Sequence, residues 1–296
     1  MERANKQRFR VVLFIVLIIG AIYGYSNYFR PVEGNKLVDK NSVSYVNDLY
    51  YSDERIYREH LNDKEKEFYR DYLEKIKKNT RNIYLEPDNK YCNSENQCIN
   101  FVLKIHNAII FDHPEIIDLS SLIISTNQDK TKITLGYTFS LKIFKYLGTK
   151  KIERIIDGIK LETKNLTDIE KIKYVYNWIG ENNEYDHLFT YSANNQSYYN
   201  VFLKNKGVCS AFAKASQLIF QNIGIKSYIV TGSVDGVRHM WNIVELDGKN
   251  YFFDSTAATS EKNNQKLGLT QKEFNSYTLY YPNFFPKTEQ EESLLK

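Results

Sequence analysis

A cysteine, a histidine and an aspartate in the C-terminal half have the types and surroundings of a nucleophile, a base and an orienting acid. Cys209 lies in "KGVCSAFAKASQLIFQNIG", where a glycine and a valine precede an apolar run with helical spacing. This spacing predicts that Cys209 lies in the first turn of a helix. Free N–H groups and the positive partial charge at a helix N-terminus favour the thiolate, which is the reactive form. The N–H of Cys209 or Ser210 could then serve an oxyanion.

The other two residues lie on a predicted β-hairpin. "VRHMWNIVEL" and "NYFFDST" read as strands, and the "DG" between them is a strong turn signal. A two-residue turn at Asp247–Gly248 places His239 diagonally across from Asp254 on one face. A four-residue turn also leaves the two side chains on the same face of the hairpin, whereas a three-residue turn would place them on opposite faces. Diagonal neighbours are about 7–8 Å apart, so Asp254 can hold the imidazole, fix its tautomer and stabilise the imidazolium.

These three residues follow the chain order of a nucleophile, a base and an orienting group. Each one alone has a more ordinary interpretation: Cys209 as a buried thiol, His239 as a strand histidine and Asp254 as a residue at a turn. Together, on a helix and two neighbouring strands, they favour catalysis. The remaining histidines have no such partners and are interpreted as structural or surface residues: His60, His106, His113 and His187.

Helices and strands alternate irregularly before this region, which predicts an α+β fold. The amphipathic helices have buried faces at helical spacing, and they are expected at 62–79, 98–113, 150–160 and 167–182. Asn62 or Asp63 can cap the first helix, Pro114 ends the second, and Thr167 with Glu170 forms a capping box on the fourth. Strands are expected at 121–126, 132–141 and 226–234.

The N-terminus reads as a membrane anchor. "MERANKQRFR" is basic, and residues 11–29 that follow it carry no charge. The apolar run has about the 20-residue length that a spanning helix needs. The basic flank predicts a cytoplasmic N-terminus with the rest of the chain outside. The alternative is a cleaved signal peptide with a poor site after Ser26, and the uncleaved anchor is favoured.

Composition excludes some classes of function. The chain has 296 residues, 42% of them hydrophobic, and a formal charge of only +4, so neither disorder nor nucleic-acid binding is indicated. Outside the cytoplasm Cys92 and Cys98 could form a local disulfide. Two free thiols are the alternative, and a metal site is disfavoured because two thiols are only half a ligand set. Cys209 is then the odd thiol.

The motifs resemble a known family. "KGVCSAFAKASQLIFQNIGIKSYIVTG" followed by "RHMWNIVELDGKNYFFDST" is similar to the core of the transglutaminase-like superfamily, and the resemblance covers about 165–260. "NEYD" at 183–186 matches a Tyr-Asp that commonly precedes this core, and "DHPEI" at 112–116 resembles a region before the domain in exported bacterial members. The resemblance implies a papain-like fold of the exported, membrane-anchored type.

The resemblance also implies site residues. By carry-over onto the matching positions, Cys209, His239 and Asp254 form the catalytic triad, and Trp241 and Tyr185 line the cleft. The sequence departs from the family pattern after Asp-x-Thr, where alanines 257 and 258 replace an aromatic residue. This departure is expected to alter a cleft wall and to leave the triad intact.

Five segments are expected along the chain. They are a cytoplasmic flank with a transmembrane anchor at 1–30, a linker at 31–60, a small α+β region at 61–148, a transglutaminase-like catalytic domain at 149–286 and a tail at 287–296. The fold expected for the catalytic domain is a helix carrying the cysteine, packed on an antiparallel sheet that carries the histidine and the aspartate.

The expected function is that of an extracytoplasmic cysteine enzyme on the cell membrane. It would act on protein or peptide amides, with cell-wall peptides among the candidates, through a thioester acyl-enzyme. The acyl group passes to an amine in a transglutaminase, or to water in a peptidase or deamidase. A non-catalytic binding or scaffold module on the same fold is the alternative. Neither a cofactor nor a metal nor nucleic acid is expected.

Overall fold

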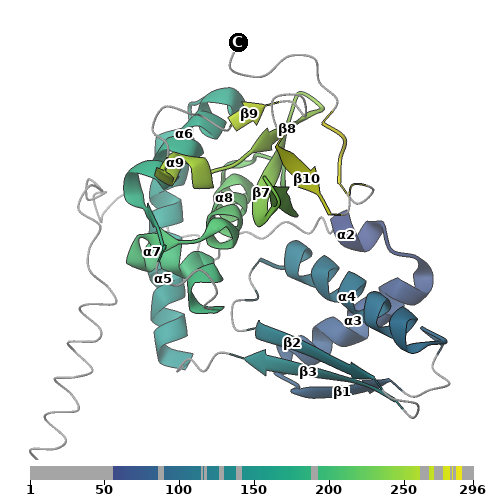
Figure 1. The fold of residues 1–296 in the computed structure, drawn as a ribbon. Coiled ribbons are helices and arrows are strands. Elements are labelled where there is room, and N and C mark those ends of the chain that lie inside the picture. Colours follow the sequence, from purple (N-terminus) through teal and green to yellow (C-terminus); the bar gives the residue numbers. More distant parts are fainter. Residues whose placement is uncertain are drawn as a thin grey trace, which may run out of the picture. The chain divides into compact units, whose positions relative to one another are not determined.

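The structure, a computed structural model, describes a defined part of the chain. The described residues are 56–85, 90–114, 116, 119–126, 130–137, 142–187, 193–260, 267–269, 276–280, 282 and 285–288. The chain divides into two compact units, residues 1–40 and residues 41–296, and the first lies outside the described residues. The elements below belong to the second unit (Figure 1).

Helices and strands alternate along this unit. The helices are α2 (Ile56–Glu59), α3 (Asp63–Lys77), α4 (Glu95–Asp112), α5 (Lys142–Thr163), α6 (Asp168–Asn182), α7 (Tyr198–Lys204), α8 (Cys209–Ile223) and α9 (Thr256–Ser260), with a 3-10 turn η1 (Ala193–Gln196). The strands are β1 (Asn82–Leu85), β2 (Leu119–Thr126), β3 (Thr131–Tyr137), β4 (Glu184–Tyr185), β5 (Lys206–Gly207), β6 (Ser227–Val234), β7 (Val237–Leu246), β8 (Lys249–Phe253), β9 (Leu267–Leu269) and β10 (Tyr277–Leu279). The mixed α+β class is confirmed.

The N-terminal part of this unit is a three-stranded antiparallel sheet, β1-β3-β2, with α3 and α4 packed on it (Figure 1). Helix α3 begins where its sequence predicts, because the Asn62 side chain and the Glu65 side chain cap each other's backbone N–H groups. The sheet contributes Ile83 and Ile133 to a core that also holds buried side chains of both helices. The predicted helix at 98–113 is confirmed, although α4 starts earlier, at Glu95.

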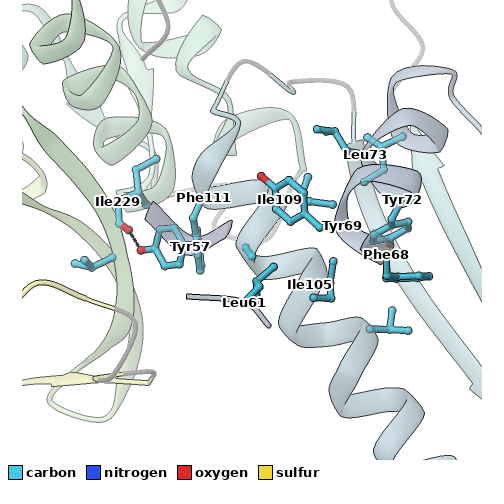
Figure 2. Close-up of a cluster of buried hydrophobic side chains, with 14 of the residues drawn as sticks. Tyr57, Leu61, Phe68, Tyr69, Tyr72, Leu73, Ile105, Ile109, Phe111 and Ile229 are labelled. Atoms are coloured by element: carbon cyan, nitrogen blue, oxygen red, sulfur yellow. Dashed lines mark hydrogen bonds between the residues drawn. The ribbon is translucent and has the colours of Figure 1, made fainter. Parts of the chain in front are cut away.

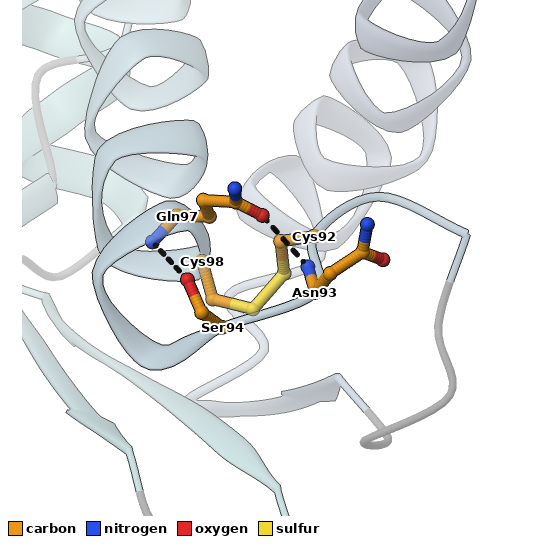
Figure 3. The surroundings of a disulfide bond; sticks show 5 residues. All are labelled: Cys92, Asn93, Ser94, Gln97 and Cys98. Atoms are coloured by element: carbon orange, nitrogen blue, oxygen red, sulfur yellow. Dashed lines mark hydrogen bonds between the residues drawn. A yellow bond between two sulfur atoms is a disulfide. The ribbon is translucent and has the colours of Figure 1, made fainter.

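A disulfide joins Cys92 to Cys98 at the start of α4 (Figure 3). Ser94 caps this helix by accepting a hydrogen bond from the Gln97 N–H, and the Gln97 side chain accepts one from the Asn93 N–H. Both sulfurs belong to buried residues of the core. Of the alternatives that the sequence leaves open, the structure therefore shows the disulfide, and it leaves Cys209 as a free thiol.

The C-terminal part is built on a five-stranded antiparallel sheet with the order β10-β6-β7-β8-β9. Helix α8 lies against β7 (Figure 1) and ends at Gly224, which adopts the left-handed conformation with φ 80°. Helix α6 begins at the predicted capping box of Thr167 and Glu170. The strands predicted at 226–234 and in the hairpin after it are confirmed as β6, β7 and β8.

One hydrophobic cluster joins the N-terminal elements to the five-stranded sheet (Figure 2). Tyr57 of α2 contacts Phe111 of α4 and Phe285 near the C-terminus, with ring centroids 5.0 Å and 5.5 Å away. Its hydroxyl donates a hydrogen bond to the backbone oxygen of Ile229 in β6. The predicted linker at 31–60 therefore ends in a short helix, α2, and the tyrosine of this helix is buried in the core.

Some predicted boundaries are wrong. The strand predicted at 132–141 ends at Tyr137, and α5 is already formed from Lys142, well before the predicted 150. The second hairpin strand stops at Phe253 because the Asp254 side chain accepts a hydrogen bond from the Thr256 N–H and starts α9 there. The predicted tail at 287–296 is not contradicted, but its first two residues pack on the domain: Thr288 is buried and the Lys287 carbonyl accepts a hydrogen bond from Asn250.

The predicted membrane anchor at 11–29 lies outside the described residues. Among the helices that the structure describes, none combines the length and the apolar character needed to cross a bilayer. The boundaries proposed for the five segments stay predictions.

Candidate active site

Helix α8 presents Cys209 at its first position. Val208 is the N-cap and provides no side-chain bond; its carbonyl accepts the N–H groups of Ala211 and Phe212 at 2.9 and 3.1 Å. Among the described residues, no acceptor contacts the N–H of Cys209 or of Ser210. The thiol is partly exposed. The first turn of α8 thus combines an accessible sulfur with two free backbone donors, as the sequence predicts.

The approach to Cys209 is fixed by a small parallel sheet. Strand β5 pairs with β4, in the register Tyr185 to Gly207, and the Asp186 N–H donates to the Gly207 oxygen at 2.9 Å. A Cβ on Gly207 would lie 2.8 Å from the Cβ of Ala211, which is shorter than van der Waals contact. Glycine is required there because the chain turns closely onto its own helix.

The β7–β8 hairpin brings His239 to Asp254. Asp247 and Gly248 both have positive φ, 51° and 72°, which is the backbone of a two-residue type I′ turn. The register pairs Leu246 with Lys249 and continues down the two strands. His239 therefore lies diagonally across from Asp254, and its Nε2 is 2.8 Å from the carboxylate Oδ2. The predicted register and the predicted contact are both confirmed.

Asp254 is a buried carboxylate with three hydrogen-bond partners. Its Oδ1 accepts from the Thr256 N–H at 2.9 Å, and its Oδ2 accepts from the Tyr277 hydroxyl at 2.6 Å as well as facing His239. Burial alone would raise the pKa of Asp254. The charge of His239 and the hydrogen bonds from His239, Tyr277 and the Thr256 N–H outweigh that effect and lower the pKa below 3.8. The group is therefore held as a carboxylate.

His239 lies between Asp254 and Cys209. Burial would lower the pKa of His239, but the charge of Asp254 and the hydrogen bonds with Asp254 and Cys209 raise the pKa to about 10. Because Nε2 faces Asp254, Nδ1 is the ring nitrogen left for the thiol. The structure thus joins His239 to Asp254 by a hydrogen bond, and Cys209 is among the groups that raise the pKa of His239.

Two neighbours of His239 on β7 support this arrangement. The indole of Trp241 stacks on the imidazole at 5.9 Å with an interplanar angle of 21°. Asn242 is fully buried and donates from Nδ2 to the Ala213 carbonyl at 3.0 Å. Since Ala213 lies one turn after Cys209 on α8, this bond fixes the helix that carries the cysteine to the strand that carries the histidine.

Trp241 and Tyr185, which the family resemblance assigns to the cleft, differ in exposure. Trp241 is 1% exposed and lies in the core beside His239. Tyr185 is partly exposed; its ring lies 6.4 Å from Phe212 of α8 and 4.9 Å from the exposed His187. Tyr185 therefore lies over the first turn of α8, whereas Trp241 is buried behind the imidazole.

The alanines that replace an aromatic residue after Asp-x-Thr lie where α9 crosses α6. A Cβ on Gly180 of α6 would be 2.7 Å from the Ala258 carbonyl oxygen, so the two helices touch backbone to backbone. Small residues permit this approach. The departure from the family pattern is explained by helix packing, and it leaves the His239–Asp254 contact in place.

Sequence reasoning missed Tyr277. Strand β10, which carries Tyr277, pairs with β6. The segment "SYTLYY" has strand-like composition, but nothing in it signals which tyrosine meets Asp254.

The other histidines lie apart from this site: His106 is buried and bonded to the Tyr72 hydroxyl at 3.0 Å, and burial lowers its pKa to about 4. Within the described ranges, no three His, Cys, Asp or Glu residues form a group that could hold a metal ion.

The comparison with protein families agrees with this geometry. The model described as the transglutaminase-like superfamily matches residues 157–254, which include Cys209, His239 and Asp254. This part of the chain is a transglutaminase-like superfamily domain. The matched range ends at Asp254, so Tyr277 and the rest of β10 lie beyond it.

The comparison with solved structures finds partial matches at low sequence identity. One is a TGase, with 16% identity, a TM-score of 0.36 and coverage of 50% of this chain and 47% of that one. Another is the periplasmic domain of TgpA from Pseudomonas aeruginosa bound to ethylmercury, with 10% identity, a TM-score of 0.31 and coverage of 45% of this chain and 57% of that one. The matched regions thus span about half of each of those chains, 47% and 57%. No curated protein sequence matches this chain.

Proposed function

We propose that this protein is a membrane-anchored, extracytoplasmic cysteine enzyme that acts on protein or peptide amides through a thioester intermediate. The observation that carries the proposal is the hydrogen bond between His239 and the buried Asp254 carboxylate, and the free thiol of Cys209 also raises the pKa of this histidine. In this arrangement Cys209 is the nucleophile, His239 the general acid and base, and Asp254 the group that orients the imidazole.

In the first half-reaction the Cys209 thiolate attacks the carbonyl carbon of the amide, and a C–S bond forms. The carbonyl oxygen becomes an oxyanion, for which the free N–H groups of Cys209 and Ser210 at the start of α8 are suitable donors. The His239 imidazolium then gives its Nδ1 proton to the amide nitrogen. The C–N bond breaks, the amine leaves, and a thioester on Cys209 remains beside a neutral imidazole.

In the second half-reaction His239 takes a proton from the incoming nucleophile, which attacks the thioester carbonyl. The C–S bond breaks and the Cys209 thiolate is restored next to the imidazolium. An amine nucleophile yields a new amide, as in transglutamination. Water yields an acid, as in deamidation or peptide hydrolysis. Both routes use the same three residues, so the acceptor is decided by what reaches the thioester.

The proposed location rests on two independent features of the chain. The basic residues before the uncharged run at 11–29 favour a cytoplasmic N-terminus and an exported domain. The Cys92–Cys98 disulfide supports the same side of the membrane, because disulfides persist mainly in oxidising compartments. Substrates on the outer face of the membrane, including cell-wall peptides, would then be within reach. Labelling of Cys209 in intact cells by a membrane-impermeant maleimide tests this, and absence of labelling would contradict it.

The reaction is tested on the full chain in detergent with a glutamine-containing peptide and a primary amine, followed by mass spectrometry. An amine adduct identifies transglutamination, a gain of about one mass unit identifies deamidation, and a shortened peptide identifies proteolysis. Each product should be absent with Cys209→Ala. A peptide that stays unchanged with several sequences would favour the non-catalytic alternative.

Alkylation of Cys209 provides a test that needs no substrate. Iodoacetamide at neutral pH should modify Cys209 faster than a free cysteine in a short peptide, because the helix N-terminus and the imidazolium favour the thiolate. His239→Ala should remove most of this excess rate, whereas the exposed His187→Ala should leave it unchanged. Equal rates for the wild type, the His239 variant and the peptide would exclude the proposed nucleophile.

A further inference from the structure

Tyr277 lies beyond the region matched by the family model, yet it contacts the proposed triad directly. Its hydroxyl donates to Oδ2 of Asp254 at 2.6 Å, and this is the same oxygen that faces His239 Nε2 at 2.8 Å. We propose that Tyr277 is a positioning residue of the active site: it fixes the Asp254 carboxylate in the rotamer that holds the His239 imidazole. This inference rests on the proposed function and adds a fourth side chain to it.

The buried carboxylate needs a fixed orientation because its two oxygens have different tasks. Oδ1 is bound by the Thr256 N–H at 2.9 Å, which ties it to the start of α9. Oδ2 must point at the imidazole, and Tyr277 is the neutral donor that holds it there. Without that hydroxyl, His239 would be the only group holding Oδ2 in place. His239 cannot fix the carboxylate independently, because its own orientation depends on Asp254.

The ring of Tyr277 also restricts the imidazole sterically. Its centroid is 5.9 Å from that of His239 at an interplanar angle of 73°, and 5.0 Å from that of Trp241 at 81°. His239 is thus stacked on Trp241 and met edgewise by Tyr277. Both are favourable aromatic geometries. The hydroxyl and the ring therefore act together, one on the carboxylate and the other on the imidazole.

The fold delivers Tyr277 to this place through a close contact between strands. Strand β10 pairs with β6, with Leu279 opposite Gly232, and Gly232 is in turn opposite His239 on β7. A Cβ on Gly232 would lie 1.9 Å from the Thr278 backbone oxygen, so only glycine lets β10 come this near. Gly232 thus sets the distance from which Tyr277 reaches Asp254.

The test is Tyr277→Phe in the full chain, which removes the hydroxyl and keeps the ring. We expect the alkylation rate of Cys209 at neutral pH to fall about tenfold, which is the factor that one hydrogen bond to a charged group is worth. We also expect the downfield proton resonance of the His239 Nε2–H, which reports its bond to a carboxylate, to shift and broaden. Unchanged rate and resonance would overturn the inference.

A double-mutant cycle distinguishes positioning from a separate effect. If Tyr277 acts through Asp254, Tyr277→Phe should change the alkylation rate in the wild-type background and not in an Asp254→Asn background. Equal changes in both backgrounds would contradict the inference. Tyr72→Phe is the matched control, because it removes another buried tyrosine hydroxyl, bonded to His106, far from Cys209 along the chain. It should leave both readouts unchanged.

The outcomes also separate this inference from the proposed function. If wild-type Cys209 reacts as slowly as a free peptide thiol and His239→Ala has no effect, the proposed function fails before Tyr277 is considered. If wild-type Cys209 is reactive and depends on His239, but Tyr277→Phe behaves like Tyr72→Phe, only the role of Tyr277 is wrong.

Discussion

The Nε2 atom of His239 lies 2.8 Å from Oδ2 of Asp254, although His239 lies on β7 and Asp254 directly follows β8. The two-residue turn at Asp247 and Gly248 sets this contact, because it fixes the parity of every pair in the ladder. A single inserted residue in the turn would move His239 and Asp254 to opposite faces. The length of the turn therefore decides whether His239 and Asp254 can interact.

The first prediction concerns the pH dependence of the His239–Asp254 pair. The raised pKa of His239, about 10 against an ordinary 6.5, stabilises the folded state fully below pH 6.5, and this contribution is lost as pH rises towards 10. The lowered pKa of Asp254 also stabilises the folded state at pH values above 3.8, the ordinary pKa of an aspartate. This contribution is lost as the pH falls below that value. The stability deficit of Asp254→Asn should therefore be largest between about pH 4 and 6.5 and should shrink towards pH 10.

Denaturant unfolding of both proteins across this pH range measures the deficit. NMR titration of labelled His239 gives an independent check, because its pKa should fall from about 10 towards 6.5 in the variant. A deficit that stays constant with pH, together with an unshifted His239 titration, would show that the two groups are not coupled.

A second prediction concerns the buried bond between α8 and β7. Asn242→Ala removes the donor to the Ala213 carbonyl and leaves that acceptor buried. The free energy of unfolding should fall by about 1–3 kcal/mol, and the alkylation rate of Cys209 should fall too, because the helix loses its attachment to the strand. Asn222→Ala is the control, since its bond to the Leu218 carbonyl stays within α8 and is only partly buried. Similar losses in both variants would argue against a special role for Asn242.

A third prediction compares two glycines in helices. A Cβ on Gly180 would lie 2.7 Å from the Ala258 carbonyl oxygen, whereas a Cβ on Gly158 meets nothing within 4 Å. Gly158→Ala should stabilise the protein by about 0.5–1 kcal/mol, because alanine is the better helix former. Gly180→Ala should destabilise it, because α6 and α9 must separate. Thermal unfolding of the two variants measures the difference, and equal shifts would show that the α6–α9 contact yields easily.

A fourth prediction concerns the disulfide. Cys92→Ser with Cys98→Ser should lower the free energy of unfolding by about 2 kcal/mol, the chain-entropy value for a closed loop this short. Reductant should destabilise the wild type by a similar amount and have no effect on the double variant. The Cys209 alkylation rate should not change in either case. A rate that falls with the disulfide would instead connect that end of α4 to the active site.

The nature of the site follows from local sequence. Gly207, Cys209 and the apolar run after them place a thiol at a helix N-terminus, and the Asp-Gly turn pairs His239 with Asp254. These are short-range features, fixed by helix periodicity, caps and turn chemistry. For the same reason the capping boxes at Asn62 and Thr167 start α3 and α6 where their residues predict.

Contacts between distant segments were decided only in three dimensions. The pairing of β10 with β6 depends on Gly232, whose missing side chain makes room for the Thr278 carbonyl. Likewise, the sequence places Tyr57 in a predicted linker, whereas in the folded protein its hydroxyl donates a hydrogen bond to the Ile229 carbonyl. Short strands and helices of a few residues carry too little periodicity to be seen in a single sequence.

Local sequence features therefore predict the three candidate groups of the site, because helix caps, strand alternation and a two-residue turn act over a few neighbouring residues. The folded protein adds three relationships that no short segment contains: Cys209 raises the pKa of His239, Asn242 joins α8 to β7, and Tyr277 donates to Asp254. Those contacts depend on packing between segments far apart in the chain, and side-chain volume and backbone approach settle such packing only when the whole core is assembled.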